Sequence, residues 1–254
     1  MLLAVDVGNT HTHFGTFRDG ELVEHWRFAT VAEWTRDELG AALRALLELR
    51  GIGLADVGAS IVSSTVPSLE PEWLAVGRRY LGHVMLSVGP GLKTGMALRY
   101  DNPHEIGADR LANAIAIKDR FGGPAICVDF GTSVNFDIVG PNGDFLGGVL
   151  VPGVEISLAA LTARGAKLPA VDLLPPRTVI GKSTVEAIRS GVVYGFAGAI
   201  DGILGRLLDE LGDETDVIAT GGLAGVIVPF TEHIDEIDDF LTLTGLRLLY
   251  ERNS

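Results

Sequence analysis

Near its start the chain reads Leu2-Leu3-Ala4-Val5-Asp6-Val7-Gly8-Asn9-Thr10, and its second half contains Ala125-Ile126-Cys127-Val128-Asp129-Phe130-Gly131-Thr132-Ser133. In each copy an apolar run ends in an aspartate, a glycine follows two residues later, and a threonine comes soon after the glycine. A short apolar run bounded by turn residues is typical of a buried strand. The two stretches therefore predict the same unit twice, a buried strand, an Asp-Gly turn and a returning strand, which is an internal repeat.

Turn signals and apolar periodicity predict the elements that follow each copy. Asp19-Gly20 and Asn142-Gly143 are typical of hairpin turns, and they join predicted strands at 13–17 and 22–28 and at 134–139 and 145–149. Thr35 and Glu38 have capping-box spacing before a helix that ends at Gly51. Further strands are expected at 61–62, 84–88 and 216–220, and further helices at 70–81, 108–121, 154–163, 183–211 and 242–252. In the longest of these helices, close packing is suggested by the spacing of Gly191, Gly195, Gly198 and Gly202.

Together these elements predict an α/β protein of two related lobes, 1–118 and 119–254, in which helices flank mixed sheets. Lobes that each open with a strand, an Asp-Gly turn and a returning strand are similar to the actin-like (ribonuclease H-like) lobes of the actin/hexokinase-like ATPase superfamily. The resemblance implies that the two turns face each other across a cleft and grip the phosphates of a nucleotide.

Charge and composition argue against several classes of partner. The 254 residues carry a formal net charge of −13, whereas nucleic acids and anionic membrane surfaces require a basic face. Cys127 is the only cysteine, so neither an intrachain disulfide nor a cysteine-based zinc site can form. The first residues lack a signal-peptide pattern, and no apolar run approaches about 18 residues. We therefore expect a cytoplasmic protein without a membrane span.

The two Asp-Gly turns have the composition of phosphate-binding loops. Glycine lets the backbone approach a phosphate closely, and the hydroxyls of Thr10, Thr12 and Thr132 can donate hydrogen bonds to phosphate oxygens. A strand-end carboxylate such as Asp6 can hold Mg²⁺ directly or through water. The alternative is an ordinary β-turn whose aspartate caps its own backbone, and it is less favoured because the pattern occurs twice. Asp129 follows a buried strand and needs either a cation or a network of donors.

The segment Tyr100–Arg110 contains the least generic sequence in the chain, with Gly107, Asp109 and Arg110 where a helix is predicted to begin. A carboxylate at that point can act as a general base toward an alcohol, and Arg110 can supply a fixed cation for an anionic substrate. The same residues also suit an ordinary helix N-terminus, with Asp109 as a first-turn acid and Arg110 in a surface ion pair. The residues alone leave these two interpretations equal.

An ordered set of motifs is similar to the type III pantothenate kinases over nearly the whole chain. The set consists of Asp6-Val7-Gly8-Asn9-Thr10, Gly107-Ala108-Asp109-Arg110, Asp129-Phe130-Gly131-Thr132, Gly147-Gly148 with Pro152-Gly153, and Gly181-Lys182-Ser183-Thr184. The resemblance implies a homodimer that uses ATP with Mg²⁺ and requires K⁺ or NH₄⁺. It implies the phosphorylation of pantothenate to 4′-phosphopantothenate, the first step of coenzyme A synthesis.

The resemblance also implies roles for individual residues. Asp109 matches the catalytic base, Asp129 matches the ligand of the monovalent cation, and Asp6 is a candidate Mg²⁺ ligand. The expected ATP contacts are Asp6, Val7, Gly8, Asn9, Thr10, His11, Thr12, His13 and Thr132. The expected pantothenate contacts are Tyr100, Gly107, Ala108, Asp109, Arg110 and, near the dimer interface, Thr184. His13 departs from the family pattern, in which a smaller or aliphatic residue is expected.

Three further patterns have competing interpretations. Gly181-Lys182-Ser183 resembles the end of a Walker A loop, but Pro176 stands where that pattern requires glycine and no strand is predicted directly before it. His11 and His13 share a strand face without a third Cys or His nearby, which favours a solvated or cleft-lining pair over a metal site. The Gly-rich turn at Thr220–Ala224 suits either the adenosine of a nucleotide or a plain tight turn.

Two other functions remain compatible with the fold. One is a sugar or acyl kinase of the same superfamily, and the other is a non-catalytic regulator or filament protein. The adjacent Asp109 and Arg110 argue against the first, and Asp109 beside two intact turns argues against the second. An ADP-release assay with and without pantothenate separates the three.

Overall fold

The computed structural model describes residues 1–165 and 168–254 and divides into two compact units. The first unit consists of Met1–Ala97, Asp101–Ala116 and Phe240–Ser254, and the second consists of Leu98–Tyr100 and Ile117–Asp239. The lobes expected from the sequence, 1–118 and 119–254, differ from these units mainly at the C-terminal helix, which packs with the first sheet.

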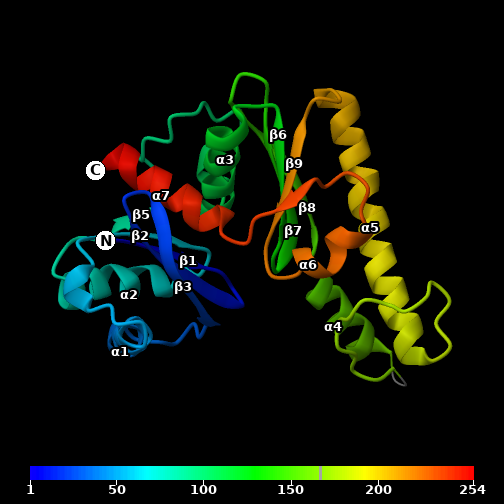
Figure 1. Ribbon diagram of the computed structural model, residues 1–254, viewed down its shortest axis with the longest axis horizontal. Coiled ribbons are helices and arrows are strands. Elements are labelled where there is room, and N and C mark those ends of the chain that lie inside the picture. The colour runs from blue at the N-terminus through cyan, green and yellow to red at the C-terminus, as the bar shows by residue number, and fades with distance from the viewer. Residues whose placement is uncertain (166–167) are drawn as a thin grey trace. The chain divides into compact units, whose positions relative to one another are not determined.

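A five-stranded mixed sheet forms the centre of the first unit, in the order β3-β2-β1-β4-β5 (Figure 1). Its strands are β1 (Leu2–Val7), β2 (His11–Arg18), β3 (Glu21–Ala29), β4 (Ala59–Ser64) and β5 (Leu86–Ser87). β1, β2 and β3 form an antiparallel meander, whereas β4 pairs in parallel with β1 and β5 pairs in parallel with β4. The predicted hairpin turn is confirmed, because Asp19 and Gly20 have φ values of 51° and 87°, as a type I′ turn requires.

Helices cover both faces of this sheet. They are α1 (Arg36–Glu48), α2 (Leu69–Val76), α7 (Leu241–Asn253) and the first part of α3 (Ala108–Phe121). Leu3 and Phe14 are fully buried in a core shared with α1 and α2, and each such side chain contributes about 1.5–3 kcal/mol. α7 packs against β1, β2 and β4. Gly15 permits its close approach, since a Cβ at this position would lie 3.1 Å from Leu243 Cδ1.

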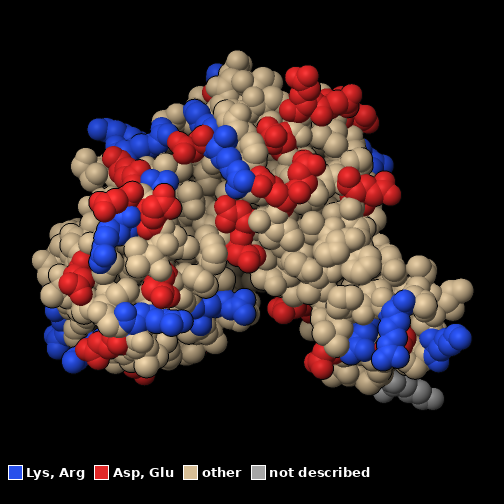
Figure 2. Space-filling model, in the orientation of Figure 1, with Lys and Arg blue, Asp and Glu red and all other residues tan. Residues whose placement is uncertain are grey.

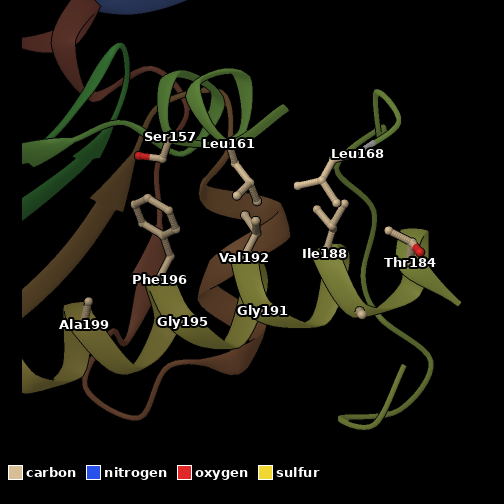
Figure 3. Close-up of a pocket in the computed structure, with 11 residues that line it drawn as sticks. Ser157, Leu161, Leu168, Thr184, Ile188, Gly191, Val192, Gly195, Phe196 and Ala199 are labelled. Carbon is tan, nitrogen blue, oxygen red and sulfur yellow. The ribbon is translucent and has the colours of Figure 1, made fainter. Parts of the chain in front are cut away.

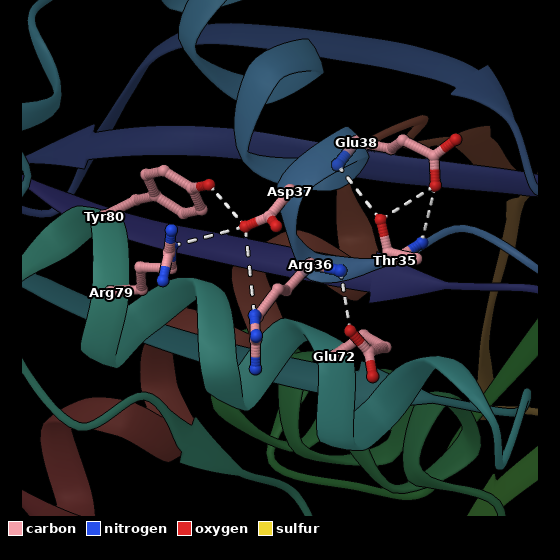
Figure 4. Close-up of polar contacts among 7 residues, drawn as sticks. All are labelled: Thr35, Arg36, Asp37, Glu38, Glu72, Arg79 and Tyr80. Carbon is pink, nitrogen blue, oxygen red and sulfur yellow. Dashed lines mark hydrogen bonds and ion pairs between the residues drawn. The ribbon is translucent and has the colours of Figure 1, made fainter.

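Polar contacts join α1 to α2 and to the π-helical turn Gly77–Leu81 that follows it (Figure 4). The predicted capping box is confirmed, because the Thr35 N–H donates to the Glu38 carboxylate at 2.8 Å while the Thr35 hydroxyl accepts from the Glu38 N–H. The Tyr80 hydroxyl donates to Asp37 at 2.6 Å and holds the pKa of that carboxyl below its ordinary value. Gly40 lets the Tyr80 ring lie against α1, since a Cβ there would be 2.6 Å from the ring.

The second unit repeats this topology, with the strand order β10-β9-β6-β7-β8. Its strands are β6 (Ala125–Phe130), β7 (Ser133–Val139), β8 (Phe145–Pro152), β9 (Asp216–Thr220) and β10 (Glu236–Ile237). β6, β7 and β8 form an antiparallel meander, β9 pairs in parallel with β6, and β10 pairs in parallel with β9. The internal repeat predicted from the two Asp-Gly turns is therefore confirmed strand for strand.

The helices of the second unit are α4 (Val154–Arg164), α5 (Thr184–Leu211) and α6 (Ala224–Ile227). They share a core with the sheet in which Ile126, Val128 and Phe136 are fully buried. α5 has no uninterrupted apolar run of about 18 residues. An 18-residue window within it nevertheless has a mean hydropathy of 1.3, enough to span a membrane by length and composition. Such a window is weak evidence, because core helices of soluble proteins also contain one. Only 28% of it is buried inside this chain, which leaves apolar surface for another contact.

Short elements and one helix end differ from the sequence-based expectation. The helix expected at 70–81 changes after Val76 into a π-helical turn, Gly77–Leu81. A Cβ at Gly77 would lie 2.9 Å from Met85 Cβ, so packing decides the geometry there. The strand expected at 84–88 is reduced to the two residues of β5. β10 and α6 span two and four residues, which is too short to leave a periodic signal.

Candidate active site

The first turn, between β1 and β2, is closed by its own backbone and held by the residue after β3. The Gly8 N–H donates to the His11 carbonyl at 3.0 Å, so this donor is used inside the turn. The Thr30 hydroxyl donates to the Gly8 carbonyl at 2.8 Å, and the Thr30 N–H donates to the Thr10 carbonyl at 2.9 Å. Asn9 and Thr10 are exposed at the tip, where a phosphate can reach them.

Two of the expected ATP contacts face the interior of the first unit. Val7 is 0% exposed and Thr12 is 1% exposed. Thr12 Oγ1 lies 2.9 Å from Thr30 Oγ1, so Thr12 supports the side chain that holds the turn. The stretch Asp6–His13 therefore divides into an exposed tip and a buried support.

Asp6 lies at the C-terminal end of β1, where one carboxylate oxygen accepts a hydrogen bond from the Ser63 hydroxyl at 2.5 Å. His13 is directly opposite on β2. Burial, and then the charge of Arg27, lower the pKa of His13 to about 4, so its ring is neutral at pH 7. The rings of His11 and His13 are 6.5 Å apart. Across residues 1–165 and 168–254, no three His, Cys, Asp or Glu side chains are grouped to hold a metal ion.

The second turn, between β6 and β7, is one residue shorter than the first. The Gly131 N–H donates to the Ser133 carbonyl at 3.0 Å, and the Gly153 N–H donates to the Thr132 carbonyl at 3.1 Å. A Cβ at Gly153 would overlap that same carbonyl, so the close approach requires glycine. Asp129 lies near the end of β6 in the position that Asp6 has on β1.

Gly221, for which the sequence leaves adenosine binding and a plain turn open, packs against Asp129. Its φ is +94°, and a Cβ there would lie 2.7 Å from Asp129 Oδ1 and 2.7 Å from the Phe130 nitrogen. Glycine is therefore required at the end of β9 both by the backbone conformation and by the space. Sequence reasoning misses this contact with the aspartate, because the two residues are far apart in the chain.

Asp109 is the second residue of α3 and lies in space that Gly107 leaves open. A Cβ at Gly107 would be 2.5 Å from Asp109 Oδ1, which also accepts a hydrogen bond from the Arg110 N–H at 2.9 Å. Burial raises the pKa of Asp109 above its ordinary value, while the Arg110 N–H acts in the opposite direction. A carboxylate with a raised pKa is a stronger general base than an ordinary aspartate.

Tyr100 lies in the second unit, whereas Asp109 lies in the first. The Tyr100 ring centroid is 6.1 Å from that of Phe145, the first residue of β8. Gly147 has a φ of +120°, and a Cβ there would contact the Tyr100 ring at 3.5 Å. Gly147 of β8 thereby leaves room for the Tyr100 ring to pack against the strand.

Thr184 is the first residue of α5, and the Ser183 hydroxyl caps the helix by accepting from the Glu186 N–H at 3.2 Å. An apolar groove of about 560 Å³ follows α5 from Thr184 and is lined by Leu161 and Phe196, among others (Figure 3). The glycines of α5 do not pack closely inside this chain, because a Cβ at Gly191, Gly195 or Gly198 would meet nothing within 4 Å. No strand directly precedes Gly181-Lys182-Ser183 in the described part of the chain, which is unlike a Walker A loop.

Sequence comparison decides the family. The sequence model of the type III pantothenate kinases matches residues 2–206. The chain belongs to the type III pantothenate kinase family. It is 51% identical to the type III pantothenate kinase of Streptomyces griseus over 261 residues, which cover 100% of this chain and 98% of that protein. It is 47% identical to that of Moorella thermoacetica over 254 residues, which cover 100% of both.

Solved structures of distant proteins share the fold of this pantothenate kinase family member. Component A of (R)-2-hydroxyglutaryl-CoA dehydratase from Acidaminococcus fermentans superposes with a TM-score of 0.54 at 16% identity, covering 100% of this chain and 96% of that one. The ethanolamine utilization protein EutJ from Carboxydothermus hydrogenoformans gives a TM-score of 0.57 at 15% identity, covering 97% and 89%. At these identities the likeness concerns the two-lobed fold alone.

Within each compact unit the predicted residues of this family member form coherent groups. The first unit contains the candidates in Asp6–His13 and in Gly107–Arg110. The second contains Tyr100, Asp129, Thr132 and Thr184. The candidate base and one Asp-Gly turn thus belong to one unit, and the second turn belongs to the other.

Proposed function

We propose that this chain transfers the γ-phosphoryl group of ATP to the primary hydroxyl of pantothenate. The product is 4′-phosphopantothenate, and the reaction is the first step of coenzyme A synthesis. Membership of the type III pantothenate kinase family supports pantothenate as the acceptor. The observation that carries the chemistry is Asp109, a carboxylate of raised pKa in space left open by Gly107.

Two turns of the same topology support ATP as the phosphoryl donor. Asn9 and Thr10 are exposed residues of the first turn, the part of the chain that a phosphate would approach, and Thr132 is the counterpart of Thr10 in the second turn. Ser63 fixes the carboxylate of Asp6, the type of ligand that Mg²⁺ prefers, and phosphate oxygens complete such sites. Asp6 would hold Mg²⁺ there, and the ion would supply positive charge against the phosphates.

We assign the monovalent cation, K⁺ or NH₄⁺, to Asp129. This carboxylate lies near the end of a buried strand, and Gly221 packs against its Oδ1. A hard cation takes oxygen ligands, and the carbonyl groups of a tight turn are additional candidates. A cation bound there would offset the negative charge of this carboxylate.

Asp109 acts on the acceptor. Its carboxylate orients the hydroxyl of pantothenate toward the γ-phosphorus and accepts the proton late in the transfer. The guanidinium of Arg110, on a side chain that is 6% exposed, provides a fixed positive charge beside the anionic substrate. Positioning and charge stabilisation supply most of the acceleration in phosphoryl transfer, so these two residues work by geometry as much as by chemistry.

A homodimer is supported by the apolar face of α4 and α5. Ile156 is 49% exposed and Leu161 is 44% exposed. Figure 2 shows a stretch without charged side chains over the middle of α5, where residues 191–200 contain no charged residue. The open glycines of α5 allow a partner helix to approach closely. Contact with a second copy, rather than with lipid, covers this face in a cytoplasmic enzyme, and it brings Thr184 to the interface.

An ADP-release assay tests the function and the base together. The parent protein should release ADP only when pantothenate is present, and Asp109→Asn should lower kcat by about 10²-fold or more with ATP still bound. Because protonation inactivates a base, kcat should rise with pH through a pKa above the ordinary 3.8 of aspartate. Asp119→Asn is the matched control, since Asp119 is an exposed residue of the same helix.

Stability separates catalysis from folding in this test. A carboxyl with a raised folded-state pKa costs stability as the pH rises through that pKa, so Asp109→Asn should not lower Tm at pH 7. Near-normal turnover of Asp109→Asn would remove Asp109 as the base. ADP release that responds to a sugar or an acyl acid instead of pantothenate would replace the substrate, and no release with any acceptor would indicate a non-catalytic protein.

A further inference from the structure

The strand register places four residues in a row across each sheet at the level of its Asp-Gly turn. On the first sheet, from β4 through β1 and β2 to β3, the row reads Ser63, Asp6, His13 and Arg27. On the second sheet, from β9 through β6 and β7 to β8, it reads Thr220, Asp129, Asn135 and Leu150. Directly opposite residues on neighbouring strands project from the same face of a sheet. Arg27 therefore stands on the same face as Asp6.

Arg27 is an exposed cation on β3, and its neighbours on the same face of the sheet carry no negative charge. The residues two positions away on β3 are His25 and Ala29, and the opposite residue is His13. Within the part of the chain that the structure describes, Arg27 forms no ion pair with an Asp or Glu, whereas Arg44 on α1 pairs with a glutamate at 2.7 Å. A chain with 33 acidic and 20 basic residues offers many such partners. The charge of Arg27 is therefore left for a ligand.

His13 stands between this cation and the carboxylate of Asp6 in the row, because it pairs with Asp6 on β1 and with Arg27 on β3. Two antiparallel neighbours lie about 4.5–5.5 Å apart at Cα, so the Cα atoms of Asp6 and Arg27 are about 10 Å apart. A metal ion at the carboxylate and a phosphate beneath the guanidinium fit within this span.

We propose that Arg27 is a further phosphate-binding residue, whose guanidinium contacts the terminal phosphate of ATP on the sheet face that carries Asp6. This inference rests on the proposed kinase function. A guanidinium binds phosphate oxygens through two parallel N–H donors, which fixes the orientation of the group as well as its charge.

The second sheet gives the internal comparison. Leu150 occupies the place of Arg27 in its row and is 56% exposed. An exposed leucine cannot bind a phosphate, although the hydroxyl and the aspartate of the two rows match. The cation is therefore a specific addition to the first sheet, on the lobe in which Asp6 is the candidate Mg²⁺ ligand.

The test compares nucleotides that differ by one phosphate. Arg27→Gln should weaken ATP binding about 10-fold or more, measured by calorimetry without pantothenate, and change ADP binding less than about 3-fold. Arg27→Lys should be intermediate, because an ammonium keeps the charge but loses the paired donors. In steady-state assays the KM for pantothenate should remain that of the parent.

Arg18→Gln is the matched control. Arg18 is an exposed arginine of the same β2–β3 hairpin, five residues beyond His13 along β2, so it lies about 16 Å from the row. This variant makes the same change in net charge and should bind both nucleotides as the parent does. An equal loss for ATP and ADP in Arg27→Gln, or no loss for either, would overturn the proposal.

The test of Arg27 by ATP and ADP binding does not depend on which molecule accepts the phosphoryl group. If the parent protein releases no ADP with pantothenate, the proposed function fails, but the ATP and ADP affinities of Arg27→Gln still decide the role of Arg27. If the parent is active and Arg27→Gln retains the parent's preference for ATP over ADP, the role of Arg27 alone is overturned. Arg27 is exposed, so equal Tm values for variant and parent confirm that the fold is unchanged.

Discussion

The two Asp-Gly turns occupy the same place in the same topology, yet the first is held by an additional side-chain contact. In both turns the residue after the third strand of the meander donates its backbone N–H to a threonine carbonyl, from Thr30 to Thr10 at 2.9 Å and from Gly153 to Thr132 at 3.1 Å. In the first turn the Thr30 hydroxyl also donates to the Gly8 carbonyl at 2.8 Å. Gly153 has no side chain that could form such a bond. The repeat thus keeps the backbone anchor and adds the hydroxyl of Thr30 to the first turn.

The rows beside the turns differ in the same manner. Both keep an aspartate with a hydroxyl residue on the neighbouring parallel strand, and they differ on the two antiparallel strands. The first sheet has His13 and Arg27 there, whereas the second has Asn135 and Leu150. A shared topology therefore supplies two similar carboxylate positions, and the side chains of the meander decide what each position can bind.

The largest expected effects come from replacing Asp6 and Asp129 one at a time, because the two variants should respond to different cations. Asp6→Asn keeps the size of the side chain but removes the charge assigned to Mg²⁺, so we expect kcat/KM for ATP to fall about 10³-fold. Asp129→Ala should abolish activation by K⁺ or NH₄⁺, because the carboxylate assigned to that cation is gone. ADP release measured over separate Mg²⁺ and K⁺ titrations reports both effects.

The control for this pair is Asp19→Asn, at the turn between β2 and β3, which contains none of the candidate site residues. Asparagine tolerates the positive φ of 51° at that position, so stability and activity should match those of the parent. If ADP release by Asp6→Asn and by Asp129→Ala depends in the same way on Mg²⁺ and on K⁺, the two turns do not have different roles. Parent activity that is insensitive to K⁺ and NH₄⁺ would contradict the role of Asp129.

Local signals in the sequence predict most of the elements that present these turns. The Asp19-Gly20 hairpin and the capping box at Thr35 depend on a few adjacent residues, and both are confirmed. The helix expected at 108–121 has those bounds, and the one expected at 183–211 begins one residue later. Apolar periodicity and caps suffice for such long elements, because their pattern is repeated over several turns.

Contacts between distant residues could not be predicted from any local pattern. Thr30 is 22 residues from Gly8, and only the register of β3 brings its hydroxyl to that carbonyl. Gly221 meets Asp129 for the same reason, through the pairing of β9 with β6. The raised pKa of Asp109 is caused by burial, which is a property of the folded chain. Sequence alone therefore left its role equal between two interpretations until the family resemblance favoured one.

The anchor of the first turn can be weakened without changing its outline. Thr30→Val replaces the hydroxyl by a methyl group and leaves the Gly8 carbonyl and the Thr12 hydroxyl without this partner. A buried polar group that loses its hydrogen bond costs about 1–3 kcal/mol, so the free energy of unfolding should fall by about that amount. The KM for ATP should rise, because the turn loses its side-chain anchor and keeps the backbone bond from Thr30 to Thr10.

Thr30→Ser keeps the hydroxyl and is the matched control for this change. It should retain the ATP affinity of the parent and lose less stability than Thr30→Val in urea unfolding. Equal losses in the two variants would mean that the methyl group, and not the hydrogen bond, holds the turn. The second turn has no counterpart to this experiment, because its anchor is the backbone N–H of Gly153.

The smallest expected effect comes from replacing His13, in the row of the first sheet, by asparagine, the residue that Asn135 provides at the same place in the second sheet. The pKa of His13 is about 4 in the folded chain, below its ordinary 6.5, so the unfolded chain takes up the proton first as the pH falls. Stability is then lost between pH 6.5 and pH 4, by about 1–2 kcal/mol from pH 7 to pH 5. His13→Asn has no proton to take up and should lose less stability over that interval in urea unfolding, while exposed His104→Asn should behave as the parent does. If His13→Asn keeps the full loss of stability at low pH, another titratable group is responsible for that loss.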